Sequence, residues 1–150
     1  MGAVERIYLA ASHGAPPVRV ERIDVVEGMG VAGDRNFGET LWRGQNLTLI
    51  EAEAVEAVAA ISGKILDPGA ARRNLVTRGV RLNELVGVEF AIGEVVLRGI
   101  ETCEPCTTLA GHLGWEAKST LKRFRGRGGL RCDCLTSGSI EVGMQLALLP

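Results

Sequence analysis

The most constraining feature of this sequence is the shortness of the segments that lie between its glycines and prolines. Residues 51–62 are the clearest helical stretch, rich in Ala and Glu, and Gly63 ends it. Turn-forming residues separate strand-like runs rich in Val, Ile and Leu, which occupy 4–11, 18–28, 46–51, 71–79, 88–93 and 95–101. Many short strands with few helices are typical of a mostly antiparallel β-barrel.

The remaining segments add loops and small helices to this predicted barrel. Residues 28–39 hold four glycines in twelve positions, which is typical of a loop that needs positive φ or close backbone approach. We expect a turn at 80–87 and short helices at 105–114 and 115–126, the first with Pro105 near its start. Residues 128–150 predict two strands joined at 136–139. No repeat or linker divides the chain, so we expect a single domain over 1–150.

Composition excludes several classes of protein. The chain has 150 residues, of which 46% are apolar and 23% charged, as in an ordinary globular protein. Its net charge of -1 argues against binding nucleic acid or membranes through bulk charge. The start does not read as a signal peptide, and no apolar run could span a bilayer. We therefore expect a cytoplasmic protein whose cysteines are thiols.

Four cysteines allow more than one chemistry. Cys103 and Cys106 flank a Glu and a Pro, while Cys132 and Cys134 alternate on a predicted strand and so share one face. Four thiols could hold a structural zinc ion, which would make the chain a zinc-stabilised structural or interaction module. For Cys132 and Cys134 we favour the simpler interpretation, that they are small half-buried strand residues.

Cys106 differs from the other three thiols in its predicted position. If Pro105 starts a helix, Cys106 lies in the first turn, where unpaired N–H groups and the helix dipole stabilise a thiolate. A thiol with a lowered pKa can serve as a nucleophile, a sulfur carrier or a ligand to a soft metal. The alternative is a buried cysteine that merely begins a helix.

Two arginine-rich segments could bind an anion. If 71–79 is a strand, Arg72 and Asn74 share one face and could clamp a phosphate or a pterin-like heterocycle, whereas Arg73 faces the other side. Solvated arginines on a surface strand are the alternative. The second segment is a glycine-rich turn whose N–H groups could cradle an anion, or which could be a solvated basic loop or a nonspecific nucleic-acid contact. It carries Arg123, Arg125, Arg127 and Arg131.

An ordered set of segments resembles one known family. These segments run from Val31 to Leu148 and include "GVAGDRN", "RGQNLTLIEAEA", "ARRNLVTRGVRLNELVG", "CEPC", "GRGGLRC" and "SGSIEVGMQL". Together they resemble the MOSC domain, named for the C-terminal part of molybdenum-cofactor sulfurases. The resemblance implies a β-barrel with a few peripheral helices, and it implies binding of the molybdenum cofactor or handling of its sulfur or metal ligand. At the level of the whole family it also brings an association with pyridoxal phosphate.

The resemblance assigns roles residue by residue. The family's hallmark cysteine matches Cys106, which ligates molybdenum in the amidoxime-reducing relatives and is proposed to carry sulfur in the sulfurases. It is therefore the expected catalytic residue and metal ligand. The expected cofactor-binding residues match an Arg-x-Asn pattern, a Gly-Asp signature and a late basic segment. They are Arg72, Asn74, Gly33, Asp34 and Arg131.

Two functions follow from the resemblance, and each needs a partner. The chain could be a small molybdenum-dependent reductase of N-oxygenated compounds, supplied with electrons by a flavin or iron–sulfur protein. It could instead be a sulfur or cofactor carrier, supplied by a cysteine desulfurase. The larger relatives have an additional N-terminal β-barrel domain, whereas we expect this chain to be a stand-alone MOSC domain with only a short leader, from Met1 to about Gly30. A second subunit or a partner protein is therefore the expected source of the missing wall of the cofactor site.

Overall fold

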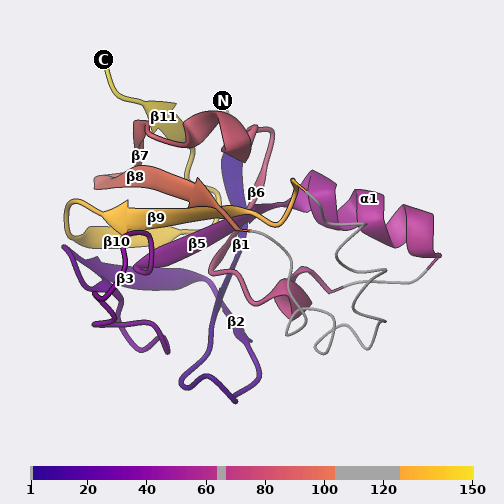
Figure 1. Cartoon of the computed structure of the whole chain (residues 1–150), viewed down its shortest axis with the longest axis horizontal. Helices are drawn as coiled ribbons and strands as arrows, with labels where there is room; N and C mark the ends of the chain where they lie inside the picture. The colour runs from indigo at the N-terminus through magenta and orange to yellow at the C-terminus, as the bar shows by residue number, and fades with distance from the viewer. Residues whose placement is uncertain (1, 64–66, 104–125) are drawn as a thin grey trace.

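The computed structural model describes residues 2–63, 67–103 and 126–150 (Figure 1). Within them the chain forms short strands, one α-helix and two 3-10 helices. In chain order the strands are β1 (Ala3–Leu9), β2 (Val18–Val20), β3 (Arg22–Val26), β4 (Gly30–Val31), β5 (Leu47–Glu51), β6 (Leu75–Arg78), β7 (Glu89–Ile92), β8 (Val95–Thr102), β9 (Leu130–Cys134), β10 (Gly138–Glu141) and β11 (Leu146–Leu148). The helices are α1 (Ala52–Ser62), η1 (Pro68–Ala71) and η2 (Leu82–Leu85).

Eight of these strands form one curled sheet. Their order across the sheet is β11-β7-β8-β9-β5-β6-β1-β2, and a smaller sheet of β10, β3 and β4 accompanies it. All pairs are antiparallel except β5 with β6, which α1 connects as a crossover helix. Figure 1 shows β8, β9 and β5 side by side across the body and α1 at one side. The mostly β fold predicted from the sequence is confirmed as a half-barrel.

The core is built almost entirely from aliphatic side chains, as the scarcity of aromatic residues requires. Phe90 is its one aromatic member among the described residues, and Cys132 and Cys134 lie in it as well. Both thiols face inward because β9 alternates buried and partly exposed positions. Each fully buried Leu or Ile contributes about 1.5–3 kcal/mol through removal of apolar surface from water. The prediction that the two thiols share one face is confirmed.

The helix α1 packs against β5 and β6 and closes a second, smaller core. Val55 and Val58 pack with Tyr8, Ile50 and Val76. Gly63 ends the helix at a φ of 69°, in the left-handed conformation that glycine adopts without strain. The helix predicted over 51–62 is therefore confirmed.

The predicted strand over 71–79 is wrong in its first half. The carboxylate of Asp67 accepts a hydrogen bond from the Gly69 amide at 2.8 Å and caps η1. Arg72 then ends η1 at a φ of 59°, so β6 begins only at Leu75. Arg72 and Asn74 do not share the face of a strand.

Other predicted boundaries also shift. The segment 18–28 contains two strands, β2 and β3, and the glycine-rich segment 28–39 contributes the short strand β4. The predicted turn at 80–87 contains η2. The helices predicted over 105–114 and 115–126 lie outside the described residues, apart from position 126.

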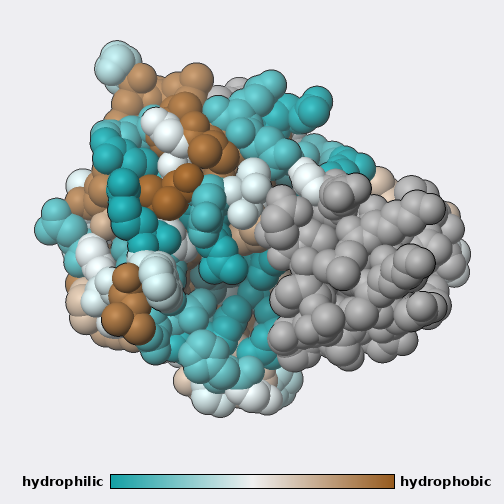
Figure 2. Space-filling model, viewed as in Figure 1, coloured by the Kyte–Doolittle hydropathy of each residue, from teal (hydrophilic) through white to brown (hydrophobic). Residues whose placement is uncertain are grey.

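The first and last strands meet. Ala3 forms a β-bridge with Gln145, and the amide of Leu146 donates a 2.9 Å hydrogen bond to the carbonyl of Gly2. Figure 2 shows hydrophobic residues gathered at the end of the molecule where β11 lies, and Leu148 is 55% exposed there.

No helix in the described part of the chain is long and apolar enough to cross a membrane.

Candidate functional site

Three arginines gather where the loop after β4 meets the segment between η1 and β6. They are Arg35, Arg72 and Arg73, and we call them the arginine cluster. The Arg35 guanidinium donates through Nη2 to the backbone carbonyl of Arg72 at 2.7 Å. Burial lowers the pKa of Arg35, and the neighbouring charges of Arg72 and Arg73 lower it further, while Asp34 opposes them. The three guanidiniums therefore lie within electrostatic range of one another.

Asp34 is the carboxylate at this cluster. Its Oδ1 accepts hydrogen bonds from the Ala10 amide at 3.0 Å and from Nη1 of Arg35 at 3.3 Å. Its Oδ2 accepts from the Asn36 amide at 3.4 Å, and the side chain is 0% exposed. One buried carboxylate beside three guanidiniums leaves an excess of positive charge. Such an excess in a partly buried place favours an anionic ligand.

Arg72 is held in an unusual conformation. Among the described residues it is the one residue other than glycine with positive φ. Such residues cost strain and are often found at functional sites. Its Nη1 donates to the carbonyl of Ala15 at 2.6 Å and its Nη2 to that of His13 at 3.1 Å. The side chain thus fastens the loop between β1 and β2 to the end of η1.

Asn74 is buried, and its side chain hydrogen-bonds to two neighbouring strands. Its Oδ1 accepts from the amide of Thr48 at 3.1 Å and from the Thr48 hydroxyl at 3.3 Å. Its Nδ2 donates to the carbonyl of Tyr8 at 3.3 Å. Asn74 therefore links β1, β5 and the start of β6, and its side chain points into this junction while that of Arg72 reaches the 13–15 loop.

Arg73 connects the cluster to the start of β9. Its Nε donates to the carbonyl of Gly128 at 3.0 Å, and the carbonyl of the next residue, Gly129, accepts from the amide of Cys103 at 2.7 Å. A Cβ on Gly129 would lie 2.1 Å from the carbonyl oxygen of Leu49, so only glycine fits this crossing. The chain therefore passes beside the arginine cluster three residues before Cys106.

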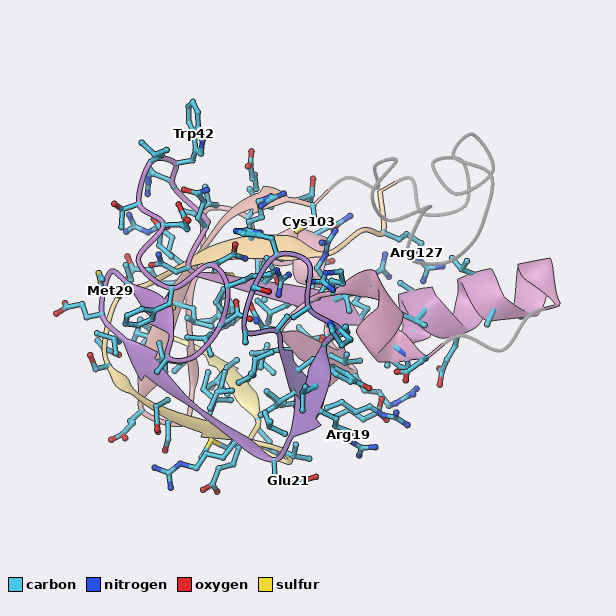
Figure 3. The ribbon with its side chains drawn as sticks, turned by 90° about the horizontal axis from the view of Figure 1, so that it is seen from below. Arg19, Glu21, Met29, Trp42, Cys103 and Arg127 are labelled. Atoms are coloured by element: carbon cyan, nitrogen blue, oxygen red, sulfur yellow. The ribbon has the colours of Figure 1, made fainter. Side chains whose placement is uncertain are left out.

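Figure 3 shows two labelled residues, Cys103 and Arg127, on the side of the molecule where α1 lies. Arg127 lies between Cys103 and α1, and Trp42 projects from the opposite end of the body. Cys103 is fully buried. Cys106, the predicted catalytic residue and metal ligand, lies outside the described residues.

The two remaining predicted residues differ in their relation to the cluster. Gly33 is exposed at a φ of 83°, and nothing lies within 4 Å of an added Cβ, so its role is to turn the chain just before Asp34. Arg131 lies on β9, and its Nε is 3.8 Å from Oε1 of Glu101 on β8. Its described ion pair therefore joins two strands and does not link it to the arginine cluster.

The thiols of Cys132 and Cys134 are poor nucleophiles. Burial raises the pKa of Cys132 well above its ordinary value, and the neighbouring Cys134 and Cys103 raise it further. Burial raises the pKa of Cys134 to about 12, with the charge of Asp133 adding to the effect. Across 2–63, 67–103 and 126–150, no group of three or more His, Cys, Asp or Glu residues could hold a metal ion. The described residues therefore give the zinc alternative no support.

Two members of the arginine cluster were not among the predicted site residues. Arg73 was assigned to the face opposite Arg72, an assignment that depended on the incorrect strand. Arg35 directly follows the Gly-Asp pair in the glycine-rich loop. An arginine beside a carboxylate in such a loop is the one signal in the sequence that could have identified it.

The fold and the arginine cluster define a class of protein, a small half-barrel domain with positive charge concentrated where the loop after β4 meets the segments that lead into β6 and β9. The chain belongs to the MOSC domain family, whose model matches residues 13–147. No curated protein matches the chain.

Several solved structures share the fold. The YuaD protein from Bacillus subtilis superposes with a TM-score of 0.81 at 17% identity, covering 97% of this chain and 94% of that one. YiiM from Geobacillus stearothermophilus gives 0.78 at 16% identity, covering 100% and 76%. YiiM from Escherichia coli gives 0.75 at 19% identity, covering 100% and 70%.

Proposed function

We propose that this chain binds the molybdenum cofactor and that Cys106 is its reactive thiol. MOSC domains are generally linked to that cofactor. The observation that supports this function most directly is the arginine cluster, in which one carboxylate accompanies three guanidiniums. The molybdenum cofactor is a pterin that carries a phosphate, so it needs such a concentration of positive charge.

The residues around the cluster fit such a group. Arginine is suited to phosphate because its planar fork can donate two parallel hydrogen bonds. The residues assigned through the family resemblance would form the walls of the site, and their contacts explain how those walls are held in place. We propose that these walls include Gly33, Asp34, Arg72, Asn74 and Arg131.

When bound, the cofactor supplies a redox-active metal for which a cysteine thiolate is a suitable soft ligand. In a reductase role, two electrons and two protons convert an N–OH group into N–H and water, and a flavin or iron–sulfur partner delivers the electrons. In a carrier role, a cysteine desulfurase transfers sulfur to the thiolate of Cys106, which holds it as a persulfide. Both roles need Cys106 as a thiolate.

Purification from a host that makes the cofactor tests the proposal. We expect the protein to retain a molybdopterin and molybdenum, identified by mass spectrometry of the released pterin and by elemental analysis. Cys106→Ser should lose the metal and keep the fold. Cys103→Ser is the matched control, and it should keep most of the metal. Absence of both pterin and molybdenum from the folded wild-type protein would refute the proposal.

The same preparation separates the two roles of Cys106. Reduction of an amidoxime with a chemical electron donor, lost in Cys106→Ser, would establish the reductase. A persulfide on the Cys106 peptide after incubation with a cysteine desulfurase and cysteine, without amidoxime reduction, would establish the carrier.

A further inference from the structure

We propose that Arg35 and Arg73 contact the anionic group of the ligand and that Arg72 is a positioning residue, which holds Arg35 through its backbone carbonyl. This inference rests on the proposed function for the identity of the ligand. It rests on the described contacts alone for the division of roles. The chemical class of the ligand at this point is a phosphate ester.

The guanidinium of Arg72 is directed away from the cluster, toward the loop between β1 and β2. Both of its terminal nitrogens already donate to carbonyls, those of Ala15 and His13, and the residue is only 8% exposed. Turning toward an anion would leave those two carbonyls without this donor. Losing such partners is costly in a buried place. The side chain of Arg72 therefore serves the loop between β1 and β2.

The backbone of Arg72, unlike its side chain, positions Arg35. Its left-handed conformation ends η1, and the carbonyl of the same residue accepts the 2.7 Å hydrogen bond from Nη2 of Arg35. Asp34 holds the other terminal nitrogen of Arg35 at 3.3 Å. Two fixed acceptors therefore orient the guanidinium plane of Arg35, as preorganised binding groups require.

Arg35 and Arg73 keep donors for a ligand. Contacts with described residues use about two of the five N–H groups of Arg35, as many as they use of Arg72, and about one of those of Arg73. Arg35 and Arg72 differ in their acceptors: Arg35 donates to residues of the cluster itself, whereas Arg72 donates away from it, to the loop between β1 and β2. Arg35 and Arg73 approach the same junction from different segments, the loop after β4 and the link before β6. Burial is the main cause of the lowered pKa of Arg35, and the charges of Arg72 and Arg73 lower it further, which shows that Arg35 and Arg73 repel each other. An anion placed between them would relieve that repulsion.

Inorganic pyrophosphate is the probe, since it carries the phosphate chemistry without the pterin. Binding is measured by titration calorimetry at low ionic strength, where screening is weak. The variants Arg35→Gln, Arg72→Gln and Arg73→Gln each remove one charge from the same cluster, and Arg19→Gln removes one from an exposed site on β2. We expect at least about tenfold weaker binding for Arg35→Gln and Arg73→Gln, the scale of a charge-assisted hydrogen bond. Arg72→Gln should lose less than about threefold, and Arg19→Gln should bind like the wild type.

A second pair of variants tests the positioning role. Arg72→Gly and Arg72→Val both remove the guanidinium, but glycine accepts a φ of 59° without strain whereas β-branched valine does not. If the backbone carbonyl positions Arg35, Arg72→Gly should bind pyrophosphate nearly as well as the wild type, and Arg72→Val should bind it at least about tenfold more weakly. Circular dichroism confirms that each variant is folded at the temperature of the titration.

The results separate this inference from the proposed function. A loss in Arg72→Gln or Arg72→Gly as large as that in Arg35→Gln would make Arg72 a direct contact and overturn the division of roles. No saturable pyrophosphate binding by the wild type would overturn the anion site itself. Neither result depends on whether the protein purifies with a molybdopterin, and failure to find that pterin would leave the titration results standing.

Discussion

The guanidinium of Arg35 donates to the backbone carbonyl of Arg72 at 2.7 Å, although 37 residues separate them in the chain. Arg72 presents this carbonyl from a left-handed conformation that few side chains adopt. Two segments far apart in the sequence are thus joined through one strained residue. The geometry of the arginine cluster therefore depends on a backbone angle as much as on the identity of its side chains.

Cys132 and Cys134 should resist alkylation in the native protein. Because burial raises the pKa of both thiols, that of Cys134 to about 12, neither forms a thiolate near neutral pH. Iodoacetamide at pH 8, followed by peptide mass spectrometry, should modify them only after unfolding in urea. Labelling of either residue as fast in the native protein as in urea would contradict the described burial.

The same two thiols give stability a predicted dependence on pH. Their pKa values are raised in the folded state, so the unfolded chain loses protons first as the pH rises above the ordinary value of 9.0. The stabilisation is complete below that value and is lost as the pH rises toward the folded pKa. Urea midpoints measured from pH 8 to 11 should therefore fall. Cys134→Ser should show a shallower fall, because serine does not titrate.

Asn74→Ala should destabilise the fold by about 1–3 kcal/mol, because it leaves the buried donors of Thr48 and the carbonyl of Tyr8 without their partner. Urea unfolding followed by circular dichroism measures the change. Asn83→Ala is the matched control, since Asn83 is exposed and donates one hydrogen bond to the carbonyl of Gly126. It should cost less than about 0.5 kcal/mol. Equal losses in the two variants would show that the buried hydrogen bonds of Asn74 contribute no more to stability than the exposed one of Asn83.

Gly129→Ala should be far more damaging than Gly126→Ala. Both glycines have positive φ, so each substitution carries the left-handed penalty of about 1–2 kcal/mol. At Gly129 the new Cβ would also lie 2.1 Å from the carbonyl oxygen of Leu49, whereas at Gly126 nothing lies within 4 Å. Thermal unfolding should show a larger loss for Gly129→Ala. Similar melting temperatures would mean that the backbone at the start of β9 shifts at little energetic cost to make room for the added Cβ.

Arg78→Ala should weaken the fold slightly at neutral pH and have no effect in acid. The Arg78 guanidinium hydrogen-bonds to Glu56 on α1 and to Glu5 on β1, and the bond from Arg78 lowers the pKa of Glu56 below its ordinary 4.5. A carboxyl group whose pKa is lower in the folded state stabilises that state at pH values above its ordinary pKa. This contribution is lost as the pH falls through the folded pKa. Unfolding midpoints at pH 7 and pH 3 measure the difference, with Arg19→Ala as control. A difference that persisted at pH 3 would point to packing by the Arg78 side chain.

Local patterns in the sequence predicted much of the fold. The helix over 51–62 and the inward face of Cys132 and Cys134 follow from spacing alone, and the structure confirms both. The segment 71–74 did not follow from spacing, because its conformation depends on Asp67 capping η1 and on the carbonyls that receive the Arg72 side chain. Those partners come from elsewhere in the chain, and strand periodicity does not record them.

Family resemblance predicted part of the candidate site. Gly33 and Asp34 were identified through family resemblance, and the structure joins Asp34 to Arg35, which in turn donates to the carbonyl of Arg72. That resemblance does not distinguish a residue that contacts a ligand from one that holds a neighbour. The distinction between Arg35 and Arg72 depends on hydrogen bonds between segments 37 residues apart, which only the folded chain displays.

The bridge between Ala3 and Gln145 has a practical consequence for protein engineering. Since the chain at the start of β1 is bridged to the residue just before β11, a short linker could join the two ends, and new ends could be opened at an exposed turn such as Gly93–Glu94. A reporter attached at either end of this chain would leave the body from the same side (Figure 1). Förster transfer between labels at the two ends would then report on their separation as the protein unfolds.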